Sequence, residues 1–300
     1  MIQRQVHLPW KKTHIVFIGD VQWSGHPEAV AIGHLQQTIA DALEYEQQGD
    51  AVYFLSMGDM TDFMSPSNRA RYTSANLYDT STETVDDTAD RLVNEIVQVA
   101  LTPTKGKWLG MVEGHHFHEF KHGDTSDMRL AKLLDARLLG PDRESDLHLG
   151  TTGLLHLVFE REQNGMQIPV TIWFAHGIGN GQTGYYPLMR LEKKAAEWEG
   201  VDVFAMGHTT KMAHEFMNKP FPRWGIGGTD THDVVHRKVI LIGTGGYSKT
   251  YVLNAKQGRI PRGGYAEQKM LNATIIGSPV LHIRPRLREG RLGIDLTAEG

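Results

Sequence analysis

The chain has 300 residues, 40% of them hydrophobic, which is enough to bury the core of one or two domains. It has no cysteine, which excludes disulfides and thiolate metal sites, and its net charge of −4 gives no general attraction to nucleic acid. No run of about 18 apolar residues occurs, so we expect a cytoplasmic protein that does not enter a membrane. The 16 histidines are unusual, because several stand beside glycine at the ends of apolar runs.

The first half of the chain alternates strand and helix patterns. Apolar runs rich in β-branched residues predict buried strands at 15–18, 51–57 and 107–112. Helical periodicity of the apolar residues predicts helices at 27–48, 85–101 and 125–139. The first two strands and the helix between them form a βαβ unit, which predicts parallel pairing with a right-handed crossover. The polar residues 63–84 predict an inserted or cap loop over the strand ends.

The second half begins with a predicted hairpin. Strand patterns at 154–160 and 168–175 flank the pair Asn164-Gly165, a dipeptide typical of tight hairpin turns. The next three segments are predicted to be a glycine-rich loop, a helix and a strand: 177–184, 187–199 and 201–206.

The C-terminal part, from about residue 211, is rich in strand patterns. Runs such as 239–242 and 280–283 are separated by glycine-rich turns at 227–228, 245–246 and 263–264. The simplest architecture is a single domain over residues 1–300, with two packed sheets flanked by helices.

Five predicted strands end in a carboxylate or an imidazole beside glycine: Asp20, Asp59, His115-His116, His176 and His208. In open α/β sheets, ligands bind just beyond the carboxyl ends of strands. One such residue alone is more often a cap or a core histidine, but five in succession predict a shared site. Carboxylates and imidazoles together suit Mn, Fe, Ni, Co or Zn, and a shared carboxylate holds two ions about 3.5–4 Å apart.

These ordered motifs resemble those of the calcineurin-like metallophosphoesterases, from about Ile15 to Thr210. That family's pattern runs Asp-x-His, Gly-Asp-x-x-Asp, Gly-Asn-His-Asp/Glu, a lone His, and Gly-His-x-His. The resemblance implies a four-layer α/β/β/α sandwich of two mixed β-sheets flanked by helices, with a dinuclear metal site at the strand ends. The altered motifs and short insertions are similar to those of phage-type members.

The resemblance implies a ligand set. Asp20 matches a ligand of the first metal, and Asp59 matches the carboxylate that bridges both ions. His176 matches the lone histidine, and His208 matches the first histidine of Gly-His-x-His; both are ligands of the second metal.

Four residues depart from the family pattern. Gln22 replaces the first histidine, His115 replaces the asparagine, and Thr210 replaces the last histidine, while Phe117 replaces the acidic residue. The second-metal set stays complete: Asp59, His115, His176 and His208. The first-metal set loses both imidazoles and becomes Asp20, Gln22, Asp59 and, as one option, Thr210. We therefore expect two divalent ions, with Mn favoured over Fe, Ni, Co, Zn or Mg, and with the first ion held more weakly.

The missing ligand leaves alternatives open. His118, His122 or His214 are further candidates, although each is expected to be a surface histidine. Arg69 and Arg71 in the polar loop either carry ordinary solvated charge or bind a substrate phosphate.

The resemblance also implies catalytic roles. His116 matches the histidine that assists departure of the leaving group, and Asp62 matches the carboxylate that orients it. The expected function is a metal-dependent phosphoester hydrolase that acts through a metal-activated water at a dinuclear site.

Substrate and catalytic competence stay open. A phosphodiesterase or nuclease is favoured, so the substrate is a phosphoester that includes nucleic acid or a nucleotide among its options. A phosphomonoesterase or protein phosphatase is the first alternative. The second is a catalytically impaired family member that serves as a binding or scaffold protein. Basic residues at 256–269 and 284–291 are either a nucleic-acid track or a solvated edge.

Overall fold

The computed structural model describes residues 1–75, 78–135, 146–161, 165–179, 181, 183, 185–223, 233–257, 259–262, 264–288 and 291–300. Some sequence predictions lie outside these residues: the helix end at 136–139, Asn164 of the hairpin turn, the Gly227-Gly228 turn, and parts of the 177–184 loop.

A five-stranded mixed sheet has the order β13-β12-β2-β3-β4. Its strands are β2 (Thr13–Ile18), β3 (Ala51–Ser56), β4 (Trp108–Met111), β12 (Val280–Arg288) and β13 (Arg291–Glu299). The predicted parallel pairing of the βαβ unit is confirmed, since β2, β3 and β4 are parallel, whereas β12 and β13 pair antiparallel. Every residue of β2 is buried, which explains its unbroken apolar run.

A six-stranded mixed sheet has the order β1-β5-β6-β7-β9-β8. Its strands are β1 (Ile2–Pro9), β5 (Thr152–Arg161), β6 (Met166–Ala175), β7 (Val203–Met206), β8 (Ala213–Arg223) and β9 (Asp233–Gly243). The predicted β5–β6 hairpin is confirmed, with antiparallel register from Thr152 opposite Ala175 to Arg161 opposite Met166. The edge strands β1 and β8 were not predicted, because edge strands expose polar residues and lack an apolar run.

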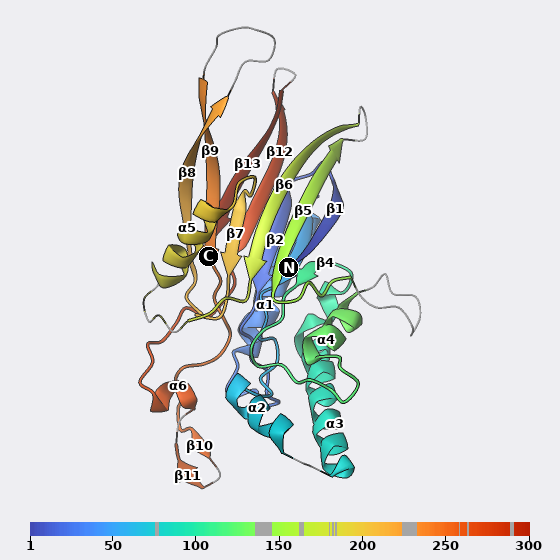
Figure 1. Cartoon of the computed structure of the whole chain (residues 1–300), viewed down its shortest axis with the longest axis vertical. Coiled ribbons are helices and arrows are strands. Elements are labelled where there is room, and N and C mark those ends of the chain that lie inside the picture. Colours follow the sequence, from blue (N-terminus) through green and yellow to red (C-terminus); the bar gives the residue numbers. More distant parts are fainter. Residues whose placement is uncertain are drawn as a thin grey trace.

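Helices cover the outer face of each sheet (Figure 1). Three helices lie against the five-stranded sheet: α1 (Ile32–Gln47), α3 (Asp79–Ile96) and α4 (Ser126–Leu134). A π-helical segment at Val97–Leu101 and a 3-10 turn at Thr102–Thr104 follow α3. The helix α5 (Tyr185–Glu197) lies against the other sheet. The four-layer α/β/β/α fold is therefore confirmed.

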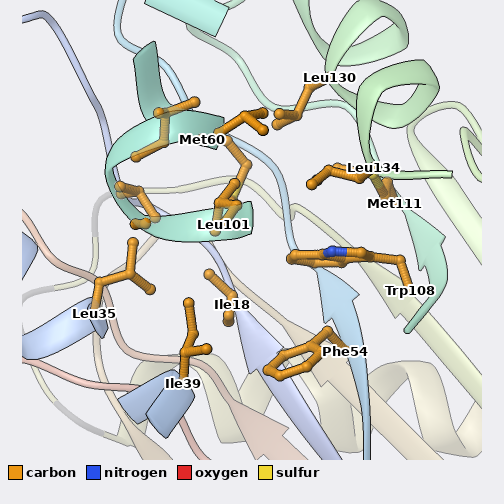
Figure 2. Close-up of a cluster of buried hydrophobic side chains, with 14 of the residues drawn as sticks. Ile18, Leu35, Ile39, Phe54, Met60, Leu101, Trp108, Met111, Leu130 and Leu134 are labelled. Atoms are coloured by element: carbon orange, nitrogen blue, oxygen red, sulfur yellow. The ribbon is translucent and has the colours of Figure 1, made fainter. Parts of the chain in front are cut away.

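Separate apolar cores join these layers. The core between α1, α3, α4 and the first sheet includes Ile18, Ile39, Phe54 and Trp108 (Figure 2). The core between the two sheets includes Phe17 of β2, Phe159 of β5 and Phe174 of β6, all fully buried. Each buried side chain of this size contributes about 1.5–3 kcal/mol of hydrophobic stabilisation. These cores hold the two sheets face to face, so the carboxyl ends of strands from both sheets have fixed relative positions.

Two short helical segments extend below the sheets in Figure 1. Helix α2 (Pro66–Ser74) lies in the segment 63–84, so the expected loop is wrong there. Ser65 caps this helix by accepting a hydrogen bond from the Asn68 amide, but none of its residues is buried, and so it shows no apolar periodicity. The second segment contains the hairpin β10 (Lys256–Gln257) and β11 (Ile260–Pro261), followed by α6 (Tyr265–Gln268).

No helix in the described part of the chain is both long and apolar enough to cross a membrane.

Candidate metal centre

The backbone bends sharply where the strands end. Five of the seven non-glycine residues with left-handed φ in the described chain lie here: Asp20 (49°), Gln22 (53°), Asp59 (50°), His208 (66°) and Thr210 (52°). Such conformations cost about 1–3 kcal/mol each and concentrate at functional sites. Hydrogen bonds between the turns hold them, since the Asp20 amide donates to the Gly58 carbonyl (3.0 Å) and the Gln22 amide to the Asp59 carbonyl (2.9 Å).

Two glycines allow these turns to pack closely. A Cβ atom on Gly114 would lie 2.0 Å from Oδ1 of Asp59 and 2.1 Å from its backbone nitrogen. A Cβ atom on Gly58, which has φ +85°, would lie 2.9 Å from Nδ1 of His176. The contact of the Asp59 carboxylate with the 114–116 turn therefore requires glycine at position 114.

The Gly114→Ala variant is expected to separate Asp59 from this turn. The added methyl group meets backbone atoms, so we expect a loss of about 1–3 kcal/mol in the free energy of unfolding and weaker metal retention. Gly33→Ala in α1 is the matched control, because its Cβ meets nothing within 4 Å and alanine favours a helix. Thermal unfolding and metal analysis measure both, and equal behaviour of the two variants would contradict the close-packing argument.

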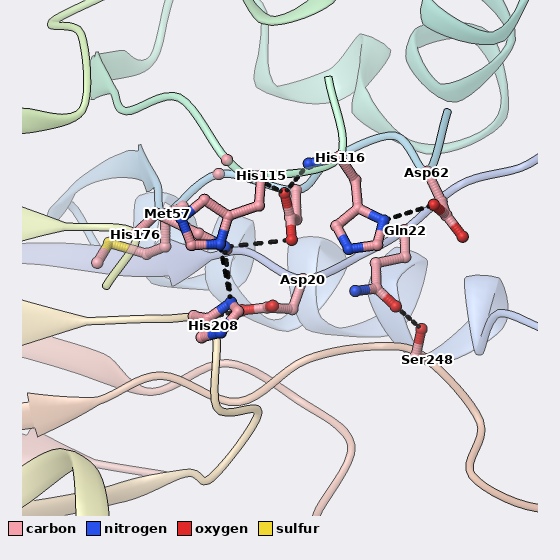
Figure 3. Close-up of polar contacts among 12 residues, drawn as sticks. Asp20, Gln22, Met57, Asp62, His115, His116, His176, His208 and Ser248 are labelled. Carbon is pink, nitrogen blue, oxygen red and sulfur yellow. Dashed lines mark hydrogen bonds and ion pairs between the residues drawn. The ribbon is translucent and has the colours of Figure 1, made fainter. Parts of the chain in front are cut away.

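Three imidazoles from different strand ends meet at one point (Figure 3). Ring nitrogens of His115, His176 and His208 all lie within 4.8 Å of one another. Nδ1 of His208 is 3.2 Å from Nε2 of His176 and 3.3 Å from Nδ1 of His115. Burial and the nearby imidazoles lower the pKa of His208 to about 4 and also lower that of His115. Both rings are therefore neutral at pH 7 and have a lone pair for a metal ion.

His176 has its tautomer set by the main chain. Its Nδ1–H donates a 2.6 Å hydrogen bond to the Met57 carbonyl, which leaves Nε2 facing the other donors. A hydrogen bond of this kind at the second ring nitrogen is typical of metal-binding histidines, because it orients the ring and increases its basicity.

A second cluster joins Asp20, Asp59 and His176, whose donor atoms also lie within 4.8 Å of one another. Oδ1 of Asp59 accepts the backbone N–H groups of His115 and His116, and Oδ2 lies 3.1 Å from Nε2 of His176. Oδ2 of Asp20 accepts the His208 amide (2.9 Å), while its Oδ1 is buried without a hydrogen-bond partner among the described residues.

The electrostatics of these buried groups favour a cation. Burial and the neighbouring Asp59 raise the pKa of Asp20 to about 7. Burial opposes charge on Asp59 and His176 as well, yet their mutual hydrogen bond lowers the pKa of Asp59 and raises that of His176 to about 9. Two carboxylates that are at most 2% exposed are costly unless positive charge accompanies them. The orphaned Asp20 oxygen and this mixed O/N donor set therefore fit divalent metal ions.

Gln22 and Thr210, the two weaker ligand candidates, are placed differently. Oε1 of Gln22 accepts the Ser248 hydroxyl (2.7 Å), at the opposite side of the cluster from His176 in Figure 3. If the Gln22 amide is turned by 180°, its NH₂ group donates to the Ser248 hydroxyl instead, because serine also accepts a hydrogen bond. The amide oxygen is then free to bind an ion. The Thr210 hydroxyl donates to the Thr209 carbonyl (2.8 Å), so the structure does not direct it at the carboxylates.

His116 and Asp62 form a pair beside the clusters. Nδ1–H of His116 donates to Oδ1 of Asp62 over 2.7 Å, and this bond raises the pKa of the imidazole. Both side chains line a cleft of about 570 Å³, together with Gln22 and His208. His116 thus faces the space where a substrate would lie, as its expected role requires.

Arg69 and Arg71 behave differently from each other, and neither lines that cleft. The Nη1 group of Arg69 donates to the carbonyls of His115 (3.1 Å) and Phe117 (2.9 Å), and the guanidinium carbon lies 3.7 Å from the centre of the Phe117 ring. Arg69 therefore holds the turn that carries His115 and His116, which corrects the interpretation of an ordinary solvated charge. Phosphate binding by Arg69 stays a prediction. Arg71 is exposed on α2.

The three further histidines lie outside the clusters. His118 is buried, so the expectation of a surface residue is wrong, and its Nε2 bonds Oδ1 of Asp86 over 2.6 Å. His122 lines a separate cleft with acidic residues of α3, and His214 lies on β8 near Phe216.

Sequence reasoning missed three supporting groups: the Met57 carbonyl, Ser248 and Asp127. Asp127, in the first turn of α4, is buried and accepts the Gly114 amide over 2.9 Å. Burial raises its pKa to about 7. No local pattern indicates these roles, because each partner lies at least 13 residues away or on the main chain.

Comparison with known proteins finds similar solved structures but no sequence relative. No family model matches the chain, and no curated protein matches its sequence. Vacuolar protein sorting 29 from Cryptosporidium parvum aligns over 96% of this chain and 98% of its own, with 12% identity and a TM-score of 0.31. A Vps29 single mutant from Entamoeba histolytica aligns over 96% and 99%, with 11% identity and a TM-score of 0.31. The sulfate thiohydrolase SoxB from Thermus thermophilus aligns over 97% and 57%, with 10% identity and a TM-score of 0.36. Scores this low support no conclusion about function.

Proposed function

We propose that this protein is a metal-dependent phosphoester hydrolase of the calcineurin-like metallophosphoesterase type, with a phosphodiesterase or nuclease activity. The observation that carries the proposal is the meeting of Asp20, Asp59, His115, His176 and His208 at the ends of strands from two different sheets, with one buried carboxylate oxygen left without a partner. Buried charges normally have a compensating partner. A buried carboxylate oxygen without one, beside other metal-binding groups, therefore indicates a place for a cation.

The two clusters have His176 in common, and Oδ2 of Asp59 lies 3.1 Å from its Nε2. We assign the donor atoms to two ion positions that would share Asp59. His115, His176 and His208 with Asp59 would hold one ion, and Asp20 and Asp59, with the Gln22 amide as an added ligand, would hold the other. Ions there would activate a water molecule and offset the negative charge of a phosphoester. We favour Mn, with the first position, at Asp20, Asp59 and Gln22, the weaker of the two, because amide oxygen binds late first-row ions less tightly than imidazole.

The chain's own residues supply the remaining steps. His116, which holds its proton through the bond to Asp62, would donate a proton to the leaving oxygen. Arg69 keeps the His116 turn in place through its bonds to two carbonyls. The Asp127 carboxylate supports the same turn from the α4 side through the Gly114 amide.

A pair of chromogenic esters tests the proposal. The full chain, supplied with Mn²⁺, is expected to hydrolyse bis(p-nitrophenyl) phosphate faster than p-nitrophenyl phosphate. The reverse order would support a phosphomonoesterase. No hydrolysis of either ester with Mn²⁺, Mg²⁺, Zn²⁺, Co²⁺, Ni²⁺ or Fe²⁺ would overturn the enzyme and favour the scaffold alternative. Metal analysis during dialysis should show one ion lost earlier than the other, and two equally retained ions would overturn the asymmetry.

A further inference from the structure

The candidate metal centre lies between two clefts. The first, here called the lysine cleft, has a volume of about 570 Å³ and is lined by His116 and Gln22 together with Lys211, Lys249 and Lys269. The second, here called the tryptophan cleft, has a volume of about 530 Å³ and is lined by His115 and His176 together with Trp173, Ile178 and Met206. Figure 3 shows His116 and His176 on opposite sides of the cluster, so the two clefts open from different sides of the same centre.

The lysine cleft has an unbalanced positive charge. Asp62 is the one carboxylate among the residues that line it, and its Oδ1 is occupied by His116. Among the described residues, no ion pair joins Lys211, Lys249 or Lys269 to a carboxylate. The remaining lining includes neutral donors such as Ser248, Thr250 and Asn272. The cleft therefore has a local excess of cations in a chain whose net charge is −4.

The three lysines come from distant parts of the chain. The Lys249 amide donates to the Ala29 carbonyl (2.9 Å), next to the bridge between Val30 and Ser248. Lys211 is half-buried just after His208, and burial lowers its pKa. Lys269 directly follows α6, in the segment that Figure 1 shows below the sheets. Their convergence therefore results from the fold and is not a run of charge in the sequence.

The position of these lysines relative to the metal centre indicates which part of a substrate they would contact. His116 lines the lysine cleft, and in the proposed function it donates a proton to the leaving oxygen, so the leaving group occupies that cleft. Ammonium groups without carboxylate partners bind phosphate as compact point charges. The tryptophan cleft is more apolar, as a base or another aromatic group on the other side of the ester would require.

We propose that the lysine cleft binds a second phosphate group, carried by the leaving group of the substrate. The substrate is then either a phosphodiester whose leaving alcohol carries another phosphate, as in an oligonucleotide strand, or a phosphoanhydride whose leaving group is itself a phosphate, as in a nucleoside polyphosphate. This inference rests on the proposed function for the direction of the leaving group, but phosphate binding by the three lysines is measured separately from hydrolysis.

Among the described residues, other basic groups are arranged differently. Arg190, Lys193 and Lys194 line the tryptophan cleft, but Glu113 and Glu197 line it too, and Lys194 pairs with Glu197. Arg286 pairs with Asp295 across the β12–β13 hairpin. Lys238 lies over the Phe216 ring on the β8–β9 hairpin, 3.7 Å from its centre. Of the two basic stretches that the sequence indicates, 256–269 contributes Lys269 to the cleft, whereas no residue of 284–288 lines it.

Fluorescence anisotropy of a fluorescein-labelled phosphorothioate dodecathymidylate, bound to the full chain in Mn²⁺, tests the binding. In Lys249→Gln/Lys269→Gln the affinity is expected to fall about fivefold to tenfold, and the salt slope to fall by about 1.4, because each contact to a single strand contributes about 0.7. The control Lys11→Gln/Lys105→Gln removes two exposed lysines that lie just before the N-terminal ends of β2 and β4, whereas the metal centre lies at the C-terminal ends of these strands. This control is expected to bind the probe as the parent does. Equal losses in both pairs, or none in the cleft pair, would overturn the inference.

Competition and turnover separate the remaining outcomes. ATP and the unlabelled strand are compared as competitors at equal concentrations of phosphate groups. If ATP displaces the probe as effectively as the strand does, the site is assigned to nucleoside polyphosphates. If ATP displaces it less, the site is assigned to strands. In kcat/KM the cleft pair is expected to lose more on a thymidylate strand than on bis(p-nitrophenyl) phosphate, which has no second phosphate. Lysine-dependent binding without turnover of any ester would remove the proposed function and retain the anion site. Turnover of bis(p-nitrophenyl) phosphate, together with strand binding that does not depend on the lysines, would remove the anion site and retain the proposed function.

Discussion

Asp59→Asn is expected to abolish phosphoester hydrolysis, with a loss on the order of 10³-fold or more in kcat. Asp59 belongs to one cluster and contacts residues of the other, through Oδ2 near His176 and through Oδ1 at the amide of His115. Asparagine keeps an acceptor for those amides but removes the negative charge that both ions would share. Hydrolysis of bis(p-nitrophenyl) phosphate in Mn²⁺, with metal analysis after dialysis, measures the effect.

A matched substitution controls for the loss of one charge. Asp41 is exposed on α1 and accepts a hydrogen bond from Gln37, so Asp41→Asn is expected to retain both activity and metal. The melting temperature of each variant shows whether the fold survives. Retention of activity and of both ions in Asp59→Asn would show that the two clusters do not form a shared centre.

His116→Ala is expected to lower kcat by about 10²–10⁴ while the metal content stays that of the parent. The imidazole bonds Asp62 and lines the lysine cleft, but it belongs to neither donor cluster. Loss of the proton donor should matter more for a thymidine dinucleotide, whose alkoxide needs a proton, than for bis(p-nitrophenyl) phosphate, whose phenolate leaves readily. Comparing the two substrates tests proton donation itself.

The partner carboxylate provides a graded control for His116. Asp62→Asn keeps a hydrogen-bond acceptor for Nδ1–H but removes the charge that raises the pKa of the ring, so an intermediate loss of kcat is expected. Metal loss in His116→Ala as large as the loss of activity would instead identify His116 as a ligand. Equal losses on both substrates would exclude a role at the leaving group.

Much of the fold follows from local patterns. The unbroken apolar run of β2 and the periodicity of α1 reflect burial, which each element needs whatever its partner is. Helix α2 and strand β1 escaped prediction for a related reason, since α2 buries none of its residues and β1 buries only Arg4 and Leu8. For the candidate site, the residue types beside the glycines were informative because strand ends are where sheets expose polar groups.

The sequence by itself determined most of the buried elements and which chemical groups stand at their ends, because apolar periodicity and glycine turns are local properties. Only the tertiary structure decided how those groups meet. It bonded Arg69 to carbonyls, set the His176 tautomer through Met57, and brought Lys211, Lys249 and Lys269 to one cleft. These contacts join residues far apart in the chain, so they depend on how two sheets pack and not on any single segment.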